Sequence, residues 1–164
     1  MASVPFCKPW PGARVLERKF QPRIQSRRMA CFLLKTDPSE YSVGDLERER
    51  RTVWDGVTNA QAVGFIRKMK EGDRAFIYHS GGESAILGLA RIVSAPRPDP
   101  SNPKSWVVDV EFERRIEPPV TLREIKADGR FSGWALVRQG RLSTMDVPEE
   151  FLAWMRQRYP SLKL

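Results

Sequence analysis

The chain has 164 residues, 41% of them hydrophobic, and its 28 Lys and Arg against 20 Asp and Glu give a net charge of +8 at pH 7. This length suits one domain with a tail, and the hydrophobic share is too high for a disordered chain. No apolar stretch approaches the roughly 18 residues that a membrane helix needs, so we expect no membrane partner.

The positive charge is concentrated at the start of the chain. Residues 1–28 contain seven Lys or Arg and one acid, Glu17, which leaves a net charge of only +2 for residues 29–164. With four prolines and no sustained periodicity, residues 1–28 are predicted to form a disordered basic arm. Three interpretations stay open: an arm that binds nucleic acid through counterion release, a transit-like peptide, or translation that starts at Met29.

The cysteines Cys7 and Cys31 lie far apart in sequence, and His79 is the only histidine. This set predicts neither a disulfide framework nor a metal site, and it is typical of a protein of the reducing cytoplasm. The chain also lacks a phosphate loop, a GxGxxG motif and a GxSxG motif. We therefore expect cytoplasmic localisation, no metal and no cofactor.

The first predicted elements are short. Cys31–Thr36 is predicted to be a buried strand, and Ser42–Glu49 a helix with Ser42 as its N-cap. Thr52–Gly56 is predicted to be a turn. A second helix is expected to begin after its N-cap Asn59, because apolar residues recur there with helical spacing.

The pattern then changes to a period of two. Strands are predicted at Arg74–Ser80 and Ala85–Ser94, followed by an exposed loop with four prolines at 96–103. Trp106–Ile116 alternates apolar and polar residues, which is typical of a half-buried antiparallel strand. Pro118-Pro119 is expected to end that strand.

The last part is predicted to contain a short helix at Leu122–Ile125, a glycine-punctuated aromatic segment at Arg130–Gly140 and a helix at Glu149–Arg158. The strands follow one another without βαβ alternation. The fold class is therefore predicted to be α+β with a mostly antiparallel, closed sheet, formed by residues 29–164 as a monomer.

The sequence gives little evidence for catalytic residues. His79 stands next to Ser80, but adjacent strand residues point to opposite faces of a sheet. Asp109, Glu111 and Glu113 have the period of two of a solvated strand face. We therefore expect no catalytic residue and no enzymatic activity.

Aromatic and amide side chains gather near predicted turns, at Trp54–Asn59, Tyr78–Ser80 and Ser132–Trp134. Proteins hold nucleobases by stacking on aromatic rings and by hydrogen bonds to the base edges. These segments supply both kinds of group, although tryptophans often belong to the core.

Four motifs, in order, resemble those of the EVE domain. Residues 32–42 (FLLKTDPSEYS) resemble W-L-x-K-x-E-P-x-x-Y-S, and residues 54–62 (WDGVTNAQA) are similar to W-D-G-V-R-N-Y-Q-A. Residues 72–80 (GDRAFIYHS) resemble G-D-x-x-F-x-Y-H-S, and residues 141–145 (RLSTM) resemble R-L-S-V. The resemblance covers residues 29–164.

This resemblance implies a PUA-like β-barrel flanked by short helices. It also implies a non-catalytic domain that binds DNA or RNA and holds a modified base, such as methylated cytosine, flipped into an aromatic pocket. Flipping costs a few kcal/mol, which stacking and edge contacts must recover.

The motifs also imply roles for individual residues. Candidate ligand-binding residues are Trp54 and Tyr78 as ring partners, Asp55, Asn59 and Ser80 at the base edges, His79, and Trp134 as a residue that closes the pocket. Candidate phosphate-binding residues are Lys35, Arg138 and Arg141. Trp54, Asn59, Tyr78 and Ser80 are expected to converge. Purely structural roles stay open for each, such as an N-cap for Asn59 or a hydrogen-bonded core position for His79.

The chain departs from the motifs at informative places. Thr58 and Ala60 replace an Arg and a Tyr, and Phe32 and Asp37 replace the Trp and Glu of the opening. Alternative functions are a domain that binds a nucleotide or nucleoside-like small molecule, an RNA-modification factor, and a protein-interaction module that uses the proline loop.

Overall fold

The computed structural model describes residues 28–164, so the predicted arm at 1–28 lies, except for Arg28, outside the described residues. One sheet holds seven strands: β1 (Cys31–Thr36), β2 (Arg51–Trp54), β3 (Arg74–His79), β4 (Ala85–Ile92), β5 (Arg97–Asp99), β6 (Asn102–Thr121) and β7 (Thr144–Asp146). The helices within residues 28–164 are α1 (Val43–Glu49), α2 (Ala60–Lys68), α3 (Leu122–Ala127), α4 (Ala135–Arg138) and α5 (Glu149–Arg158).

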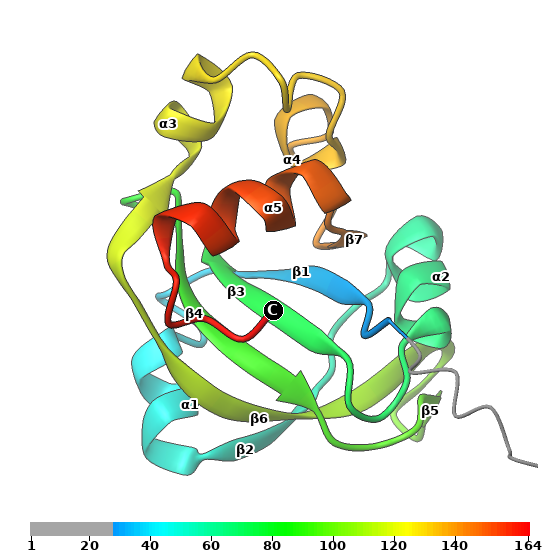
Figure 1. The fold of residues 1–164 in the computed structure, drawn as a ribbon. Coiled ribbons are helices and arrows are strands. Elements are labelled where there is room, and N and C mark those ends of the chain that lie inside the picture. The colour runs from blue at the N-terminus through cyan, green and yellow to red at the C-terminus, as the bar shows by residue number, and fades with distance from the viewer. Residues whose placement is uncertain (1–27) are drawn as a thin grey trace, which may run out of the picture.

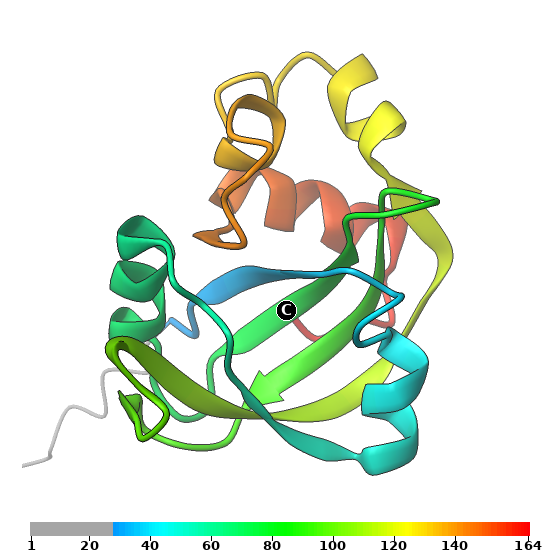
Figure 2. The same ribbon diagram turned by 180° about the vertical axis from the view of Figure 1, so that it is seen from behind.

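The sheet is mixed, with the strand order β2-β6-β4-β3-β1-β7 and β5 paired to β6. Only β1 and β3 are parallel, and the other pairs are antiparallel. The sheet is strongly bent around the core, and α3, α4 and α5 lie together beyond one side of it (Figures 1 and 2). The pairing path has two ends, β2 and β7. The α+β class is confirmed. Within residues 28–164 the sheet is curved and mixed, and no hydrogen-bonded strand pair joins its end strands β2 and β7 to close it.

Local capping rules place the two helices near the site. Ser42 and Asp45 form the capping box of α1, and the side chain of Asn59 accepts hydrogen bonds from the first backbone amides of α2. Both helix starts agree with the sequence prediction.

The prediction of a turn at Thr52–Gly56 is wrong in its first half. Arg51–Trp54 forms strand β2, which pairs with Val108–Glu111 of β6. A partner more than 50 residues away supplies the hydrogen bonds, and no local window contains that information.

Prolines interrupt strands less than predicted. β6 continues through Pro118-Pro119 to Thr121. Its register to β4 shifts between Ile86 and Gly88, so the prolines lie in an irregular part of the ladder, where their missing N–H groups cost little. The predicted loop at 96–103 similarly contains the short edge strand β5.

The segment that was predicted only as glycine-rich and aromatic contributes α4 and, with the following residues, β7. Its aromatic residues pack around Phe151 of α5. The ring centroids of Phe131 and Trp134 lie 5.1 and 4.7 Å from that of Phe151, and Phe76 of β3 contacts it edge-on. These contacts fix the C-terminal layer on the sheet.

Candidate functional site

A cavity of about 500 Å³ opens where β1 and β2 end. This volume lies within the range of small-ligand sites. Its walls come from segments far apart in sequence, namely residues 35–41, 52–57, Ser80 and 140–143. The lining residues are Lys35, Thr36, Asp37, Glu40, Tyr41, Thr52, Val53, Trp54, Asp55, Gly56, Val57, Ser80, Gly140, Arg141 and Ser143.

One wall is the end of β2 and the turn that follows it. Trp54 pairs with Val108 of β6 and is 7% exposed, so its ring is both a core residue and part of the cavity wall. Gly56 has a φ of +73°, which favours glycine in the turn. The hydroxyl of Ser105 donates a 2.6 Å hydrogen bond to the carbonyl of Val57 and anchors the far end of this turn.

The opposite wall is the loop between β1 and α1. The Thr36 hydroxyl donates to the carbonyl of Tyr41 at 2.8 Å, and the backbone amide and hydroxyl of Ser39 donate to Asp37. These two bonds from Ser39 hold the pKa of the Asp37 carboxyl below its usual range. The loop is therefore closed by its own hydrogen bonds and presents a carboxylate to the cavity.

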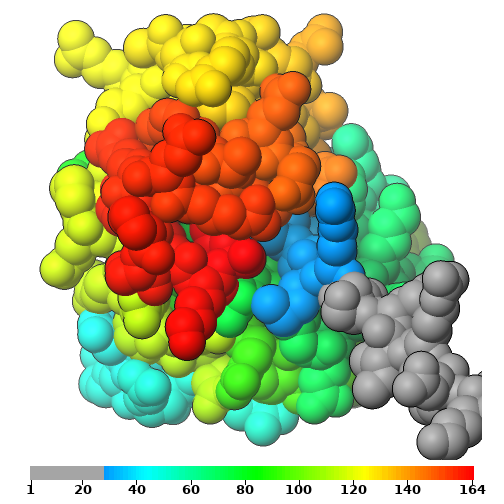
Figure 3. Space-filling model, viewed as in Figure 1, coloured from blue at the N-terminus to red at the C-terminus, as the bar shows by residue number. Residues whose placement is uncertain are grey.

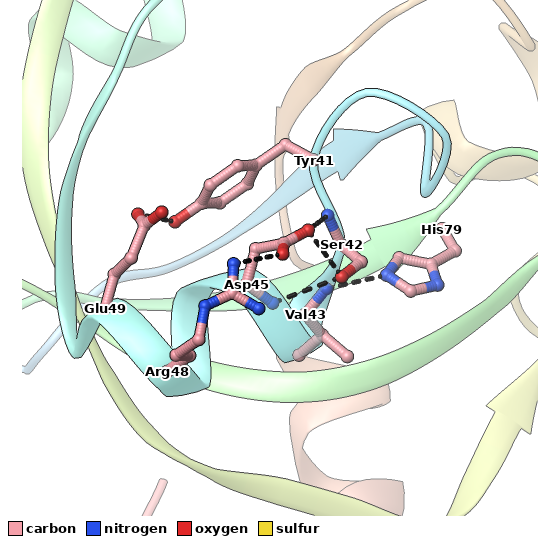
Figure 4. Close-up of polar contacts among 7 residues, drawn as sticks. All are labelled: Tyr41, Ser42, Val43, Asp45, Arg48, Glu49 and His79. Atoms are coloured by element: carbon pink, nitrogen blue, oxygen red, sulfur yellow. Dashed lines mark hydrogen bonds and ion pairs between the residues drawn. The ribbon is translucent and has the colours of Figure 1, made fainter.

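Tyr41 carries an aromatic ring into this wall. Its hydroxyl donates a 2.8 Å hydrogen bond to Glu49 at the end of α1 (Figure 4). Burial, together with this contact to Glu49, raises the pKa of Tyr41 to about 12. The hydroxyl is thus held in place by Glu49, and Tyr41 contributes an aromatic residue to the cavity lining.

His79 contacts the start of α1, directly after this loop. Its Nε2 atom accepts a 2.9 Å hydrogen bond from the backbone N–H of Val43, the first residue of α1 (Figure 4). Burial lowers the pKa of His79, and the charge of Arg115 lowers it further. The neutral imidazole therefore fixes the start of α1, and its Nε2 lone pair is occupied.

The third wall is formed by residues 140–143, and Lys35 of β1 contacts it. Its Nζ atom donates to the carbonyl of Gly140 at 2.9 Å and lies 5.6 Å from the centroid of the Tyr78 ring. Burial lowers the pKa of Lys35. The backbone amide of Lys35 also donates to the carbonyl of Ser143, so residues 140–143 are tied to the end of β1.

The structure brings five of the predicted site residues to the cavity: Trp54, Asp55, Ser80, Lys35 and Arg141. It does not bring the other five to its lining, which are Asn59, Tyr78, His79, Trp134 and Arg138. The expected convergence therefore holds for Trp54 and Ser80 but does not extend to Asn59 and Tyr78. Contacts of any of these residues with a ligand stay a prediction.

Three of the residues outside the lining have clear structural contacts elsewhere. Asn59 caps α2, and Tyr78 lies beneath Lys35. The indole N–H of Trp134 donates to the carbonyl of Asp146 at 2.9 Å, and its ring packs on Phe151 in the core rather than over the cavity.

Tyr41, Asp37 and Glu40 line the cavity but were not among the predicted site residues. All three belong to the motif at 32–42, so the signal was present. That this loop faces the Trp54 turn depends on the pairing of strands, which the motif does not state.

The charges of the cavity do not favour a polyanion. Asp37, Glu40 and Asp55 stand against Lys35 and Arg141. Among residues 28–164, no group of three or more His, Cys, Asp or Glu side chains is placed to hold a metal ion. In the same part of the chain, no helix combines the length and apolar character needed to cross a membrane.

Comparison with known proteins identifies the family to which this fold belongs. The model of the EVE domain family matches residues 30–158. This chain belongs to the EVE domain family. Human thymocyte nuclear protein 1 is 32% identical to this EVE protein over 169 aligned positions, which cover 79% of this chain and 75% of the human protein.

Solved structures give the same result. Rpa0253 from Rhodopseudomonas palustris superposes with a TM-score of 0.75 at 32% identity, covering 83% of this EVE protein and 97% of the bacterial chain. Human THYN1, solved in complex with DNA that contains 5-methylcytosine, has a TM-score of 0.71 at 28% identity and covers 79% and 96% of the two chains. ZmASCH from Zymomonas mobilis, with a TM-score of 0.51 at 10% identity over 79% and 96% of the chains, is similar in fold alone.

Proposed function

We propose that this EVE domain binds nucleic acid and holds one modified base, such as a methylated cytosine, in the cavity between Tyr41 and Trp54. The observation that carries the proposal is the cavity itself, where two aromatic residues and several hydrogen-bonding groups meet at the ends of two strands. The solved complex of human THYN1 with DNA containing 5-methylcytosine supports it for the family.

The proposed recognition combines stacking with edge contacts. A flipped base stacks on an aromatic ring, which is worth about 1–3 kcal/mol per base. The carboxylates of Asp37 and Asp55 accept hydrogen bonds from exocyclic amino groups, and the hydroxyl of Ser80 serves as donor or acceptor. A methyl group on the base adds apolar area against the ring that faces it.

The proposed role involves no chemical step. The only histidine, His79, is outside the cavity lining, and its Nε2 atom is engaged by Val43. A modified oligonucleotide incubated with the protein should therefore be recovered with unchanged mass. A product of altered mass would instead favour a modification enzyme.

The deciding experiment is a titration of the protein with matched DNA and RNA oligonucleotides that differ in one base modification. Tighter binding of at least one modified strand than of its unmodified counterpart is expected. Equal affinity across the whole panel would refute the proposal. Running the panel with and without residues 1–28 separates the contribution of the basic arm.

A second candidate is a domain for a nucleoside-like small molecule. The charges of the cavity favour it, because three carboxylates against two cations do not attract a polyanion. The titration decides between the two, since this candidate requires the free modified nucleoside to bind as tightly as the oligonucleotide.

A further inference from the structure

A second hollow, of about 420 Å³, lies on the sheet at β3, β4 and β6 and shares no lining residue with the cavity. Its hydrophobic floor is Leu89 and Phe112. Its charged residues are Arg50, Arg74, Arg91, Arg114 and Lys163 against Glu111 and Glu113. We call these charged residues and their floor the basic groove.

The basic groove and the cavity lie at opposite ends of β3. Arg74 is the first residue of this strand and lines the groove, whereas Ser80, which follows its last residue, lines the cavity. At about 3.3 Å per residue, Arg74 and His79 are about 16 Å apart along the strand. Because β3 is buried between them, a ligand that reaches both sites follows a path over the surface of at least this length. In Figure 3 the red C-terminal segment lies next to green surface of β3 and β4 on this side of the molecule.

The groove is lined by more cationic than acidic side chains. Arg74 pairs with Glu113 at 3.0 Å and Arg91 with Glu111 at 2.6 Å. Among residues 28–164, the three other cations have no carboxylate partner. These are Arg50, Arg114 and Lys163. The groove thus carries an uncompensated positive charge over an apolar floor, which strengthens attraction to an anion.

One nitrogen of the Arg74 guanidinium has no hydrogen-bond partner among the described residues. Its Nε atom binds Glu113, but its Nη1 atom is buried and has no hydrogen-bond partner among the described residues. A buried charged donor without an acceptor is costly, and native proteins rarely leave one. The Arg74 guanidinium lines the groove, so its positive charge adds to that of the other cations there.

The backbone of Arg50 also stands out. Its φ is +67°, a conformation in which glycine is favoured and arginine is strained. The guanidinium carbon lies 5.4 Å from the centroid of the Phe112 ring on the groove floor. The Arg50 side chain therefore lies over the floor of the groove and adds a positive charge there.

We propose that the basic groove is a second phosphate-binding site, which takes backbone phosphates of the strand whose base occupies the cavity. This extends the proposed function, since it assumes a nucleic-acid ligand. It assigns most of the phosphate contacts to the groove, where the cations are in excess, and the base to the cavity. A free phosphate has the same chemistry, and the experiment separates the two sources.

The test variant is Arg50→Gly/Arg114→Gln/Lys163→Gln in the full chain. It removes only cations without a carboxylate partner, and the glycine introduced at position 50 relieves the backbone. The matched control is Lys68→Gln/Lys104→Gln/Lys126→Gln, which removes the same charge from exposed positions outside the groove and the cavity. Each protein is titrated over a range of salt with an unmodified oligonucleotide of about ten nucleotides. This is longer than the ~5 nucleotide steps that correspond to 16 Å at about 3.4 Å per step of a nucleic-acid strand. Inorganic pyrophosphate is titrated in parallel.

For the groove variant, the slope of log K against log salt is expected to fall in magnitude by about 2, since each lost phosphate contact contributes about 0.7 on a single strand. The control should keep a slope close to that of wild type. Loss of pyrophosphate binding with an unchanged oligonucleotide slope would assign the groove to a free phosphate. Equal behaviour of variant and control toward both ligands would overturn the proposal.

Two further measurements keep this result distinct from the base-reading function. A modified trinucleotide is too short to span both sites, so its affinity should be the same in wild type and groove variant. Preference for a modified base is read from the panel described above. An absence of preference together with a reduced salt slope would refute the base reader and support the groove.

Discussion

The imidazole of His79, at the end of β3, accepts a 2.9 Å hydrogen bond from the backbone N–H of Val43, 36 residues earlier in the chain. This bond joins the sheet to the start of α1, immediately after the loop that carries Tyr41 into the cavity. The geometry of that cavity wall therefore depends on a titratable group that is not part of the wall.

This link predicts a pH dependence of stability. The pKa of His79 is lowered by burial and by Arg115, so the unfolded chain takes up a proton at a higher pH than the folded chain does. The contribution of His79 to stability is complete above about pH 6.5 and is lost as the pH falls through the folded pKa. In His79→Gln, whose amide oxygen replaces the acceptor and does not titrate, this part of the decrease should vanish. Denaturant unfolding from pH 8 to pH 5 measures it.

The alanine variant provides the control. His79→Ala leaves the Val43 amide without an acceptor and should lower the free energy of unfolding by about 1–3 kcal/mol at pH 8. Identical pH dependence in wild type and His79→Gln would contradict the assigned role.

Gly88 is expected to tolerate no side chain. A Cβ atom added there would lie 2.6 Å from Cγ2 of Val43, which is 2% exposed and cannot move freely. Gly88→Ala should therefore destabilise the protein by about 1–3 kcal/mol through overpacking. The double variant Gly88→Ala/Val43→Ala should lose less stability than the sum of the two single variants, and urea unfolding of all four proteins tests this coupling.

Gly64 is the matched glycine. It lies within α2, and a Cβ atom added there meets nothing within 4 Å. Gly64→Ala should raise the free energy of unfolding by up to about 1 kcal/mol, because alanine is the better helix former. Equal effects at the two glycines would rule out the close approach of Val43 as the cause.

The ring of Tyr41 is predicted to stack on the bound base. Tyr41→Ala should weaken binding of the preferred modified oligonucleotide by about 1–3 kcal/mol, as found for lost base–aromatic stacking. Tyr41→Phe keeps the ring and loses only the hydroxyl bond to Glu49, so its affinity should stay close to that of wild type. Fluorescence titration gives the affinities, and equal losses in both variants would assign the effect to the hydroxyl.

Lys35 is predicted to contact a phosphate near the cavity. Lys35→Gln removes one charge at the cavity rim, so the slope of log K against log salt should fall by about 0.7–0.9. Lys126→Gln, at an exposed position outside the cavity lining and the basic groove, serves as the comparison. A slope unchanged by Lys35→Gln would limit this residue to its hydrogen bond with Gly140.

Local features of the sequence were sufficient for several parts of this protein. The capping box of Ser42 and Asp45, the N-cap Asn59 and the alternation along β6 are rules of a few residues, and the structure agrees with each. The four motifs likewise predicted the EVE family, because they are strings of adjacent residues.

The site itself was decided by tertiary structure. Periodicity tells which side chains are buried but not what covers them, so Trp134 was predicted over the cavity and is found against Phe151. The pairing of β2 with β6 turns a predicted turn into a strand and places Trp54 opposite the loop of Tyr41. The basic groove joins Arg50 to Lys163 in the same way, across more than 100 residues. Such contacts depend on the closing of long loops around a common core, and no local stretch of sequence contains them.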